Sequence, residues 1–334
     1  MKKRVALISG GCGFEREISL LGARFFLSSV DREKYEIIDV QIDKDGAFRL
    51  RESDTAVYPV RLKDERGLFD GKRVIPIDIA FPLLHGDFGE DGKIQGALDC
   101  ADIDYVGCGV LSGSLCADKI FTKIAADSLG IPTVPWILRC DSRDCPDTEG
   151  AKRAAEENLG FPVFIKPAGL GSSFGASPAL CEDDFEAAYL NALKYSDRIL
   201  IEKMLSAPRE IELGVLISEG ERIIPPPGEV LSAGFYSYSK KYLKSDTKIV
   251  PKAILTPGEA LSLRDYAERL LDLIPIKQLS RIDFFISEGK IYLNEINTMP
   301  GFTEGSLYPL MMAEAGIGHT ELITRLIEGA VTGR

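Results

Sequence analysis

Residues 161–175 have the sequence FPVFIKPAGLGSSFG, in which an apolar strand brings one lysine to its end and then breaks into glycines and serines. The backbone N–H groups of such a loop can wrap phosphate oxygens, and the ammonium of Lys166 adds a point charge beside them. The same pattern also fits a hairpin with an edge lysine, which is common. A nucleotide site therefore needs partners elsewhere in the chain.

Partners of suitable chemistry occur near the C-terminus, in RIDFFI at 281–286 and LNEIN at 293–297. Side chains alternate along a strand, so each motif places two polar groups on one face: Arg281 with Asp283, and Glu295 with Asn297. Charged residues among Ile and Phe are not where solvated charges usually fall, although a solvated strand face is the alternative. Two carboxylates and an amide oxygen are hard ligands that suit Mg²⁺.

The connection between these two strands decides whether the carboxylates meet. For Asp283 and Glu295 to point the same way, the loop must hold an odd number of residues, and we predict the loop Glu288-Gly289-Lys290. A two-residue turn would place the carboxylates on opposite faces of the sheet. Carboxylates on opposite faces would refute the metal site.

The rest of the chain divides into three predicted units, as expected for 334 residues. Residues 1–115 alternate strands and amphipathic helices, which predicts a parallel α/β domain. Residues 116–205 begin with a helix at 118–129 that ends at glycine. Residues 206–334 combine three strands with a helix at 259–273, which predicts antiparallel sheet plus helices. A stretch at about 228–248, rich in aromatics and lysines, is predicted to be a lid loop.

Two familiar nucleotide-binding motifs are absent. GGCG at 10–13 follows a strand and opens a helix, but the third glycine of a dinucleotide fingerprint would fall at Arg16. A P-loop is excluded because Gly92-Lys93 is followed by Ile94 and the required earlier glycine is Asp87. The first glycines are interpreted as a tight turn that needs glycine for backbone reasons.

Composition limits the classes of protein to which the chain can belong. With 45% hydrophobic and 27% charged residues it is an ordinary globular protein, and its net charge of −11 disfavours nucleic acid as a partner. No apolar run is long enough for a membrane span, and the N-terminal run is too short for a signal peptide. Seven cysteines without a CxxC pair and two histidines offer little for zinc. We expect a cytoplasmic protein without nucleic-acid or membrane partners.

Seven motifs in order make the chain resemble the D-alanine–D-alanine ligases of the ATP-grasp type. They are GGCGFEREISL (10–20), HGDFGEDGKIQGALD (85–99), DKIFTK (118–123), FIKPAGLGSSFG (164–175), FYSYSKKY (235–242), RIDFF (281–285) and NEINTMPGFTEGS (294–306). The resemblance spans nearly the whole chain. It implies an ATP-grasp fold, in which the nucleotide lies between the sheets of the central and C-terminal domains, and peptidoglycan precursor synthesis as the purpose.

The resemblance assigns roles to individual residues. The ATP-binding residues would be Lys119, Lys166, Ser173, Glu202, Lys203, Leu205, Glu210 and Tyr236. Asp283, Glu295 and Asn297 would hold two Mg²⁺ or Mn²⁺ ions, in agreement with the reasoning from the strands. The implied reaction passes through a D-alanyl phosphate, which the amine of a second D-alanine attacks.

The substrate residues follow in the same way. The catalytic set would be Glu15, Ser172, Tyr242, Arg281, Gly301 and His85, and the substrate-binding set Glu15, Lys241, Asn297, Ser306 and Leu307. Glu15 would anchor the first ammonium and join Ser172 and Tyr242 in a hydrogen-bonded triad, while Arg281 and the Gly301 N–H would stabilise the oxyanion. A Glu at a helix N-terminus, and a buried histidine such as His85, also have purely structural interpretations.

Several alternatives remain open. Tyr242 favours an amine acceptor, but Gly305 replaces a histidine common in that stretch, so D-serine stays possible as the second substrate. The chain could also be another ATP-grasp ligase with a different acid or amine. A third alternative is a non-catalytic nucleotide-binding regulator on the same fold. The resemblance also implies a homodimer.

Overall fold

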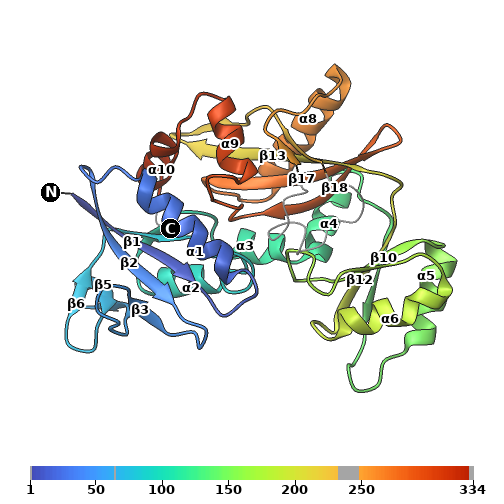
Figure 1. Ribbon diagram of the computed structural model, residues 1–334, viewed down its shortest axis with the longest axis horizontal. Helices are drawn as coiled ribbons and strands as arrows, with labels where there is room; N and C mark the ends of the chain where they lie inside the picture. The colour runs from blue at the N-terminus through green and yellow to red at the C-terminus, as the bar shows by residue number, and fades with distance from the viewer. Residues whose placement is uncertain (1, 64, 232–247, 331–334) are drawn as a thin grey trace.

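The computed structural model describes residues 2–63, 65–231 and 248–330, and three sheets with their helices make up most of it. Figure 1 shows the N-terminal sheet and a smaller sheet at opposite ends, with a larger antiparallel sheet between and above them. The predicted mixed α/β class, with an N-terminal parallel sheet and two antiparallel sheets, is confirmed. No helix in the described ranges is both long and apolar enough to cross a membrane.

The N-terminal sheet has the order β3-β2-β1-β7-β8, and its strands are parallel except for β3. Its elements are β1 (Lys3–Gly10), α1 (Arg16–Ser29), β2 (Tyr35–Ile42), β3 (Phe48–Leu50), β7 (Ile79–Pro82), α2 (Lys93–Cys100), β8 (Asp104–Tyr105) and α3 (Val110–Ala117). A separate three-stranded sheet consists of β4 (Tyr58–Leu62), β5 (Glu65–Phe69) and β6 (Val74–Pro76). The predicted tight turn is present, because Gly10 has φ +92° and an added Cβ would lie 2.4 Å from the Ile42 carbonyl oxygen.

The smaller sheet has the order β11-β10-β12-β9 and is antiparallel throughout. Its strands are β9 (Trp136–Cys140), β10 (Val163–Pro167), β11 (Ser177–Ala179) and β12 (Arg198–Lys203), and it carries α5 (Thr148–Asn158) and α6 (Glu182–Leu193). Alternate residues of β10 and β12, such as Val163, Ile165 and Ile201, are buried against these helices. The opposite face therefore carries Lys166 and Glu202.

The larger sheet has the order β16-β15-β13-β17-β18, with β14 beside β13. Its elements are β13 (Arg209–Ser218), β14 (Glu221–Ile223), β15 (Gly228–Leu231), β16 (Lys248–Val250), α8 (Pro257–Leu273), β17 (Leu279–Ser287), β18 (Lys290–Asn297), α9 (Leu307–Glu314) and α10 (His319–Glu328). Thr256 begins α8 in a capping box with Glu259, and Pro257 occupies the first turn. The three predicted strands, which are β13, β17 and β18, and the predicted helix at 259–273, which is α8, are present within two residues of their predicted bounds. β14, β15, β16, α9 and α10 were not predicted.

The predicted lid loop is shorter than expected, because both of its ends belong to strands. The predicted lid loop at about 228–248 starts with β15 and ends at the first residue of β16, and these two strands pair with each other. The strand forms because Val230 is buried with Leu307 and Met311, while Glu229 on the other side pairs with Arg209. Residues 232–247 lie outside the described ranges.

Helix α4 (Lys119–Ser128) connects the units and carries two lysines toward the space between the sheets. Asp118 caps it by accepting from the N–H groups of Ile120 and Phe121, and Gly130, with φ +64°, follows its end. Ala125 and Ala126 pack against the larger sheet and α8. The predicted domain ranges 1–115, 116–205 and 206–334 stay a prediction, but this packing ties α4 to the larger sheet.

Candidate functional site

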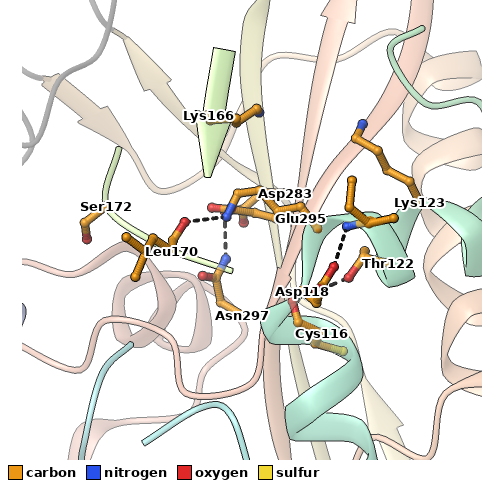
Figure 2. Close-up of polar contacts among 12 residues, drawn as sticks. Cys116, Asp118, Thr122, Lys123, Lys166, Leu170, Ser172, Asp283, Glu295 and Asn297 are labelled. Atoms are coloured by element: carbon orange, nitrogen blue, oxygen red, sulfur yellow. Dashed lines mark hydrogen bonds and ion pairs between the residues drawn. The ribbon is translucent and has the colours of Figure 1, made fainter. Parts of the chain in front are cut away.

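A cavity of about 470 Å³ lies between the smaller and larger sheets, which is a size that suits a small ligand. Ten predicted site residues line it: Lys119, Lys166, Ser172, Ser173, Glu202, Lys203, Leu205, Glu210, Asp283 and Glu295. Figure 2 shows Lys166, Asp283, Glu295 and Asn297 around one space, with Ser172 at another side of it. The structure therefore brings most of the predicted nucleotide and metal residues together.

The two predicted metal carboxylates are direct neighbours. Asp283 on β17 pairs in register with Glu295 on β18, and residues directly opposite in an antiparallel pair point to the same face. Asn297 donates from Nδ2 to Asp283 Oδ2 at 3.0 Å. The placement that a metal site requires is present, and the role of these residues stays a prediction.

The prediction of an odd loop is wrong. Ser287 pairs with Lys290, so the turn holds only Glu288 and Gly289, both in the left-handed region at φ 51° and 73°. The register then shifts between Asp283 and Phe284, since Phe284 pairs with Leu293 while Asp283 pairs with Glu295. Asn294 is the extra residue of this β-bulge. The bulge restores the phase that the short turn would have lost, so the carboxylates share one face.

Arg281 holds the carboxylates of the larger sheet. Its Nε and Nη2 donate to the two oxygens of Asp283 at 2.7 Å each, and Nε lies 3.0 Å from Glu212 Oε2. All three side chains are buried, and Glu212 pairs in register with Asp283. Glu212, Asp283 and Glu295 thus form a row across three adjacent strands. Sequence reasoning missed Glu212, although it is two residues from Glu210 on the same strand.

A second buried charge cluster lies on the smaller sheet. Glu202 pairs with Lys166 through one carboxylate oxygen and with Lys123 Nζ through the other, the latter at 2.5 Å. Burial alone would raise the pKa of Glu202, but the two lysines outweigh it and lower this pKa to about 2. Burial also lowers the pKa of Lys123. Sequence reasoning missed Lys123, although it stands one helical turn after Lys119.

Lys119 reaches the same cavity from α4. Its Nζ lies 3.2 Å from Glu295 Oε2 and donates to the Leu170 carbonyl at 2.7 Å. It thereby links the predicted metal carboxylate to the Gly/Ser loop that follows β10. Two cations, Lys119 and Lys166, consequently border the place where a phosphate chain would meet the carboxylates.

The hydrogen bond predicted between Glu15 and Ser172 for the first substrate is present. Ser172 Oγ donates to Glu15 Oε1, joining residues 157 positions apart. Space around this carboxylate is small, because a Cβ added at Gly86 would lie 2.1 Å from Glu15 Oε2. Tyr242, the third member of the predicted triad, lies outside the described residues, as do Tyr236 and Lys241.

His85 lies buried near Glu15. Its Nδ1 is 2.9 Å from the Met299 carbonyl, which can only accept, so Nδ1 carries the proton and Nε2 keeps its lone pair. Burial lowers the pKa of His85, while the charge of Glu15 opposes this shift. The imidazole is therefore neutral at physiological pH. Within the described ranges the buried Nε2 has no hydrogen-bond partner.

Glu90, which the sequence analysis did not single out, binds the backbone beside His85 and at Met299. Its carboxylate accepts from the Gly86 N–H at 2.8 Å and from the Met299 N–H at 3.1 Å. Burial and the charge of Glu15 raise its pKa to about 8, against the effect of the two N–H groups. Its position in the HGDFGED motif could have revealed it, as a carboxylate among glycines in a predicted site segment.

Ser306 and Leu307, which were predicted for the second substrate, lie at the start of α9, where the loop after β18 ends. Ser306 Oγ accepts from the Thr303 N–H at 3.0 Å, and an added Cβ at Gly301 would be 3.1 Å from the same oxygen. Leu307 packs its side chain into the core with Val230 and Met311, so only its backbone could meet a ligand. Lys203 donates to the carbonyls of Gly160 and Phe161 at 3.1 Å each, which holds its strand beside the cavity.

The buried cluster of Glu202 predicts a defined acid sensitivity. The folded-state pKa of Glu202 lies below its ordinary value, so its stabilising contribution is present above pH 4.5 and is lost as pH falls toward 2. We expect Glu202→Gln to lose about 3 kcal/mol of unfolding free energy at neutral pH and to depend less on pH in this window. Urea unfolding at a series of pH values measures both quantities.

The matched control is Glu149→Gln, which removes a carboxylate whose side chain is 81% exposed and paired with Lys152 on a helix surface. This variant should keep the wild-type stability and pH dependence. An unchanged slope between pH 4.5 and 2 in Glu202→Gln would show that the buried cluster does not control acid unfolding.

Comparison with protein families gives matches to two models. The model described as D-ala D-ala ligase N-terminus matches residues 4–108, and the one described as D-ala D-ala ligase C-terminus matches residues 125–328. Together they include every predicted site residue except Lys119. The order of the two models agrees with the order of the motifs in the sequence.

Curated relatives and solved structures agree with these models. The chain is 38% identical over 341 residues to a D-alanine–D-alanine ligase of Deinococcus radiodurans, with 100% of each chain covered. It is 38% identical over 336 residues to one of Streptococcus equi subsp. equi, covering 98% of this chain and 95% of that one. The D-alanyl-alanine synthetase A of Vibrio cholerae has a TM-score of 0.89 at 32% identity, with 98% of both chains covered. The VanG D-Ala:D-Ser ligase of Enterococcus faecalis has a TM-score of 0.88 at 30% identity, covering 99% of this chain and 100% of that one.

Proposed function

The chain belongs to the D-alanine–D-alanine ligase family, and from this we propose that it joins two D-alanines with ATP for peptidoglycan precursor synthesis. One observation carries the proposal: the cavity brings the paired carboxylates Asp283 and Glu295 together with Lys119, Lys166 and the Gly/Ser loop. The Glu15–Ser172 hydrogen bond ties the same loop to the N-terminal unit. A phosphate chain and an amino acid can therefore meet at this loop.

We propose that Asp283, Glu295 and Asn297 hold two Mg²⁺ or Mn²⁺ ions together with the phosphates. The donor set fits, because it offers few protein oxygens and leaves positions for water and phosphate. Among the described residues no three His, Cys, Asp or Glu side chains are grouped so that they could enclose an ion by themselves. The ions would supply positive charge that lets a carboxylate approach the triphosphate.

The first step converts the D-alanine carboxylate, a poor electrophile, into an acyl phosphate, a good one. An oxygen of the D-alanine carboxylate attacks the γ-phosphorus of ATP, the bond to the bridging oxygen breaks, and ADP leaves with that electron pair. Lys119 and Lys166 border the phosphate side of the cavity and stabilise its charge. Glu15 holds the D-alanine ammonium, and Ser172 holds Glu15 in place. The product is D-alanyl phosphate.

In the second step the amine of another D-alanine attacks the acyl carbon and phosphate leaves. Negative charge develops on the carbonyl oxygen, for which we assign Arg281 and the Gly301 N–H as donors. His85 is neutral, and its unprotonated Nε2 suits it to accept a proton near the second substrate. His85 and Glu90 both bind the Met299 peptide groups, which fixes the loop leading to Gly301.

The acceptor is the finer part of the proposal. The similarity to a D-Ala:D-Ser ligase keeps D-serine as the alternative second substrate. Tyr242, the residue that favours an amine acceptor in the sequence analysis, lies outside the described ranges. We assign D-alanine as acceptor because the curated relatives reported above are D-alanine–D-alanine ligases.

The cellular location, oligomeric state and partners of the protein are also part of the proposal. We propose a cytoplasmic homodimer that uses neither nucleic acid nor a membrane as a partner. The net charge of −11 supports the exclusion of nucleic acid, since a polyanion needs a dense basic surface. Sedimentation velocity at several protein concentrations would test the dimer, and a single monomer species at micromolar concentration would contradict it.

Phosphate release from Mg-ATP tests the substrate assignment. Purified protein is compared with D-alanine alone, L-alanine alone, and D-alanine mixed with D-serine or D-lactate, and product masses are determined. We expect turnover with D-alanine alone and the mass of D-alanyl-D-alanine. Turnover only in a mixture would show that the acceptor is D-serine or D-lactate and not D-alanine. No phosphate release in any mixture would favour a nucleotide-binding regulator.

A further inference from the structure

The loop that carries Glu15 and the loop that carries Ser172 also meet through aromatic rings. Phe14 stacks on Phe174 with ring centroids 4.3 Å apart and an interplanar angle of 26°. Phe14 also meets Tyr195 edge to face, at 6.0 Å and 71°. Both arrangements are favourable for aromatic pairs. These three residues are called the aromatic cluster below.

The aromatic cluster lies next to the proposed substrate contact in both loops. Phe14 immediately precedes Glu15, and Phe174 is two residues after Ser172. The same two loops are therefore joined twice, once by the hydrogen bond from Ser172 to Glu15 and once by stacked rings. Neither loop can move away from the other without breaking both contacts.

Tyr195 fixes the far side of the Gly/Ser loop. It follows α6 and packs so closely on Gly175 that an added Cβ there would lie 2.6 Å from its ring. Gly175 itself is in the left-handed region, at φ +69°. Phe174 thus has the Phe14 ring on one side, and Gly175, the residue after it, packs against the Tyr195 ring.

Two features indicate that the aromatic cluster serves the loop rather than the core. Phe14 is 54% exposed and belongs to none of the buried hydrophobic clusters of the described residues. The loop, by contrast, has two consecutive non-glycine residues in the left-handed region, Ser172 at φ 51° and Ser173 at φ 59°. That conformation is unfavourable for serine and persists only where surrounding contacts hold it.

We propose that Phe14, Phe174 and Tyr195 are positioning residues that keep the Gly/Ser loop preorganised against the Glu15 loop before substrate binds. The inference rests on the proposed function, in which this loop contacts phosphate and Ser172 holds Glu15. Preorganisation raises apparent affinity because only the fraction of molecules with a closed loop binds substrate. The aromatic cluster itself touches neither reacting atom, so it should act on binding more than on chemistry.

The variants Phe14→Ala and Phe174→Ala test this role in two ways. In ligand-free protein, amide hydrogen exchange of residues 168–176 should become about 5- to 10-fold faster, because the loop opens more often. In steady-state kinetics, KM for D-alanine and for ATP should rise about 5- to 10-fold, while kcat stays within about twofold. The double variant should show little more than either single variant, because both remove the same contact.

Controls separate positioning from general destabilisation. Phe14→Leu keeps an apolar side chain and should restore part of the affinity, and melting temperature should be nearly unchanged in every variant. Tyr58→Ala is the matched control, because Tyr58 is 55% exposed and lies on β4, away from both loops. It should leave exchange of residues 168–176 and both KM values at wild-type levels.

Unchanged loop exchange in Phe14→Ala and Phe174→Ala would overturn the inference, as would additive effects in the double variant. Loss of kcat without a change in KM would also overturn it. If the wild-type protein does not ligate D-alanine, the proposed function fails, but the exchange experiment still decides whether the aromatic cluster holds the loop.

Discussion

Arg281→Ala is expected to lower kcat by about 10²- to 10³-fold, the usual loss when one donor to a developing oxyanion is removed. Arg281 stands on the same strand face as Asp283, at the row of carboxylates that borders the cavity. Its guanidinium pairs with both Asp283 and Glu212. The KM for ATP should change much less than kcat, because the oxyanion forms only in the transition state.

Stability has to be measured beside activity in this variant. Removing Arg281 takes away a cation that pairs with the buried carboxylates of Glu212 and Asp283, which can cost about 3–5 kcal/mol. The double variant Glu212→Gln/Arg281→Ala removes one of these charges and should recover part of the stability but none of the activity. A folded Arg281→Ala protein that keeps more than about a tenth of wild-type kcat would contradict the oxyanion role.

Lys166→Met is expected to raise the KM for ATP by about 10²-fold, the effect of losing a charge-assisted contact to phosphate. The side chain lies at the end of β10 and lines the cavity, and its present partner is Glu202. Lys123 pairs with the other oxygen of Glu202, so the buried carboxylate keeps a counter-charge in the variant. The fold should therefore survive the substitution. Titration of a fluorescent ATP analogue gives the affinity without turnover.

A surface lysine provides the control for Lys166. Lys152 lies on α5, pairs with the exposed Glu149 and is not among the residues that line the cavity. Lys152→Met should leave the affinity for ATP unchanged. If Lys166→Met binds ATP as tightly as Lys152→Met does, the nucleotide phosphates do not lie beside β10.

The strands and helices that frame the cavity, such as β10, β17, β18 and α4, were predicted from the sequence, but the bulge in β18 was not. If side chains alternated with one phase along the whole of β18, an odd loop at Glu288 would be needed to bring Asp283 and Glu295 to one face. The buried residues of β18 are Ile291, Leu293 and Ile296, so the last spacing is three instead of two. That spacing is the signature of an extra residue, and it was visible in the sequence.

The sequence predicted the identity of the cavity residues better than their partners. Strand alternation and motif order indicated Asp283, Glu295 and Lys166, all of which line the cavity. Partners that lie on other elements, such as Lys123 for Glu202, depend on how α4 packs between the sheets. The contact of Phe14 with Phe174 likewise joins distant segments, and neither residue has a local pattern that indicates it.

Isotope transfer tests the central claim most directly, namely that this cavity activates a D-alanine carboxylate with ATP. D-alanine with ¹⁸O in both carboxylate oxygens is incubated with Mg-ATP and the protein, and the phosphate released is analysed by mass. If a D-alanyl phosphate forms, one ¹⁸O per dipeptide appears in inorganic phosphate, because the attacking oxygen leaves with it. Dipeptide formation with unlabelled phosphate, or no dipeptide at all, would contradict the account.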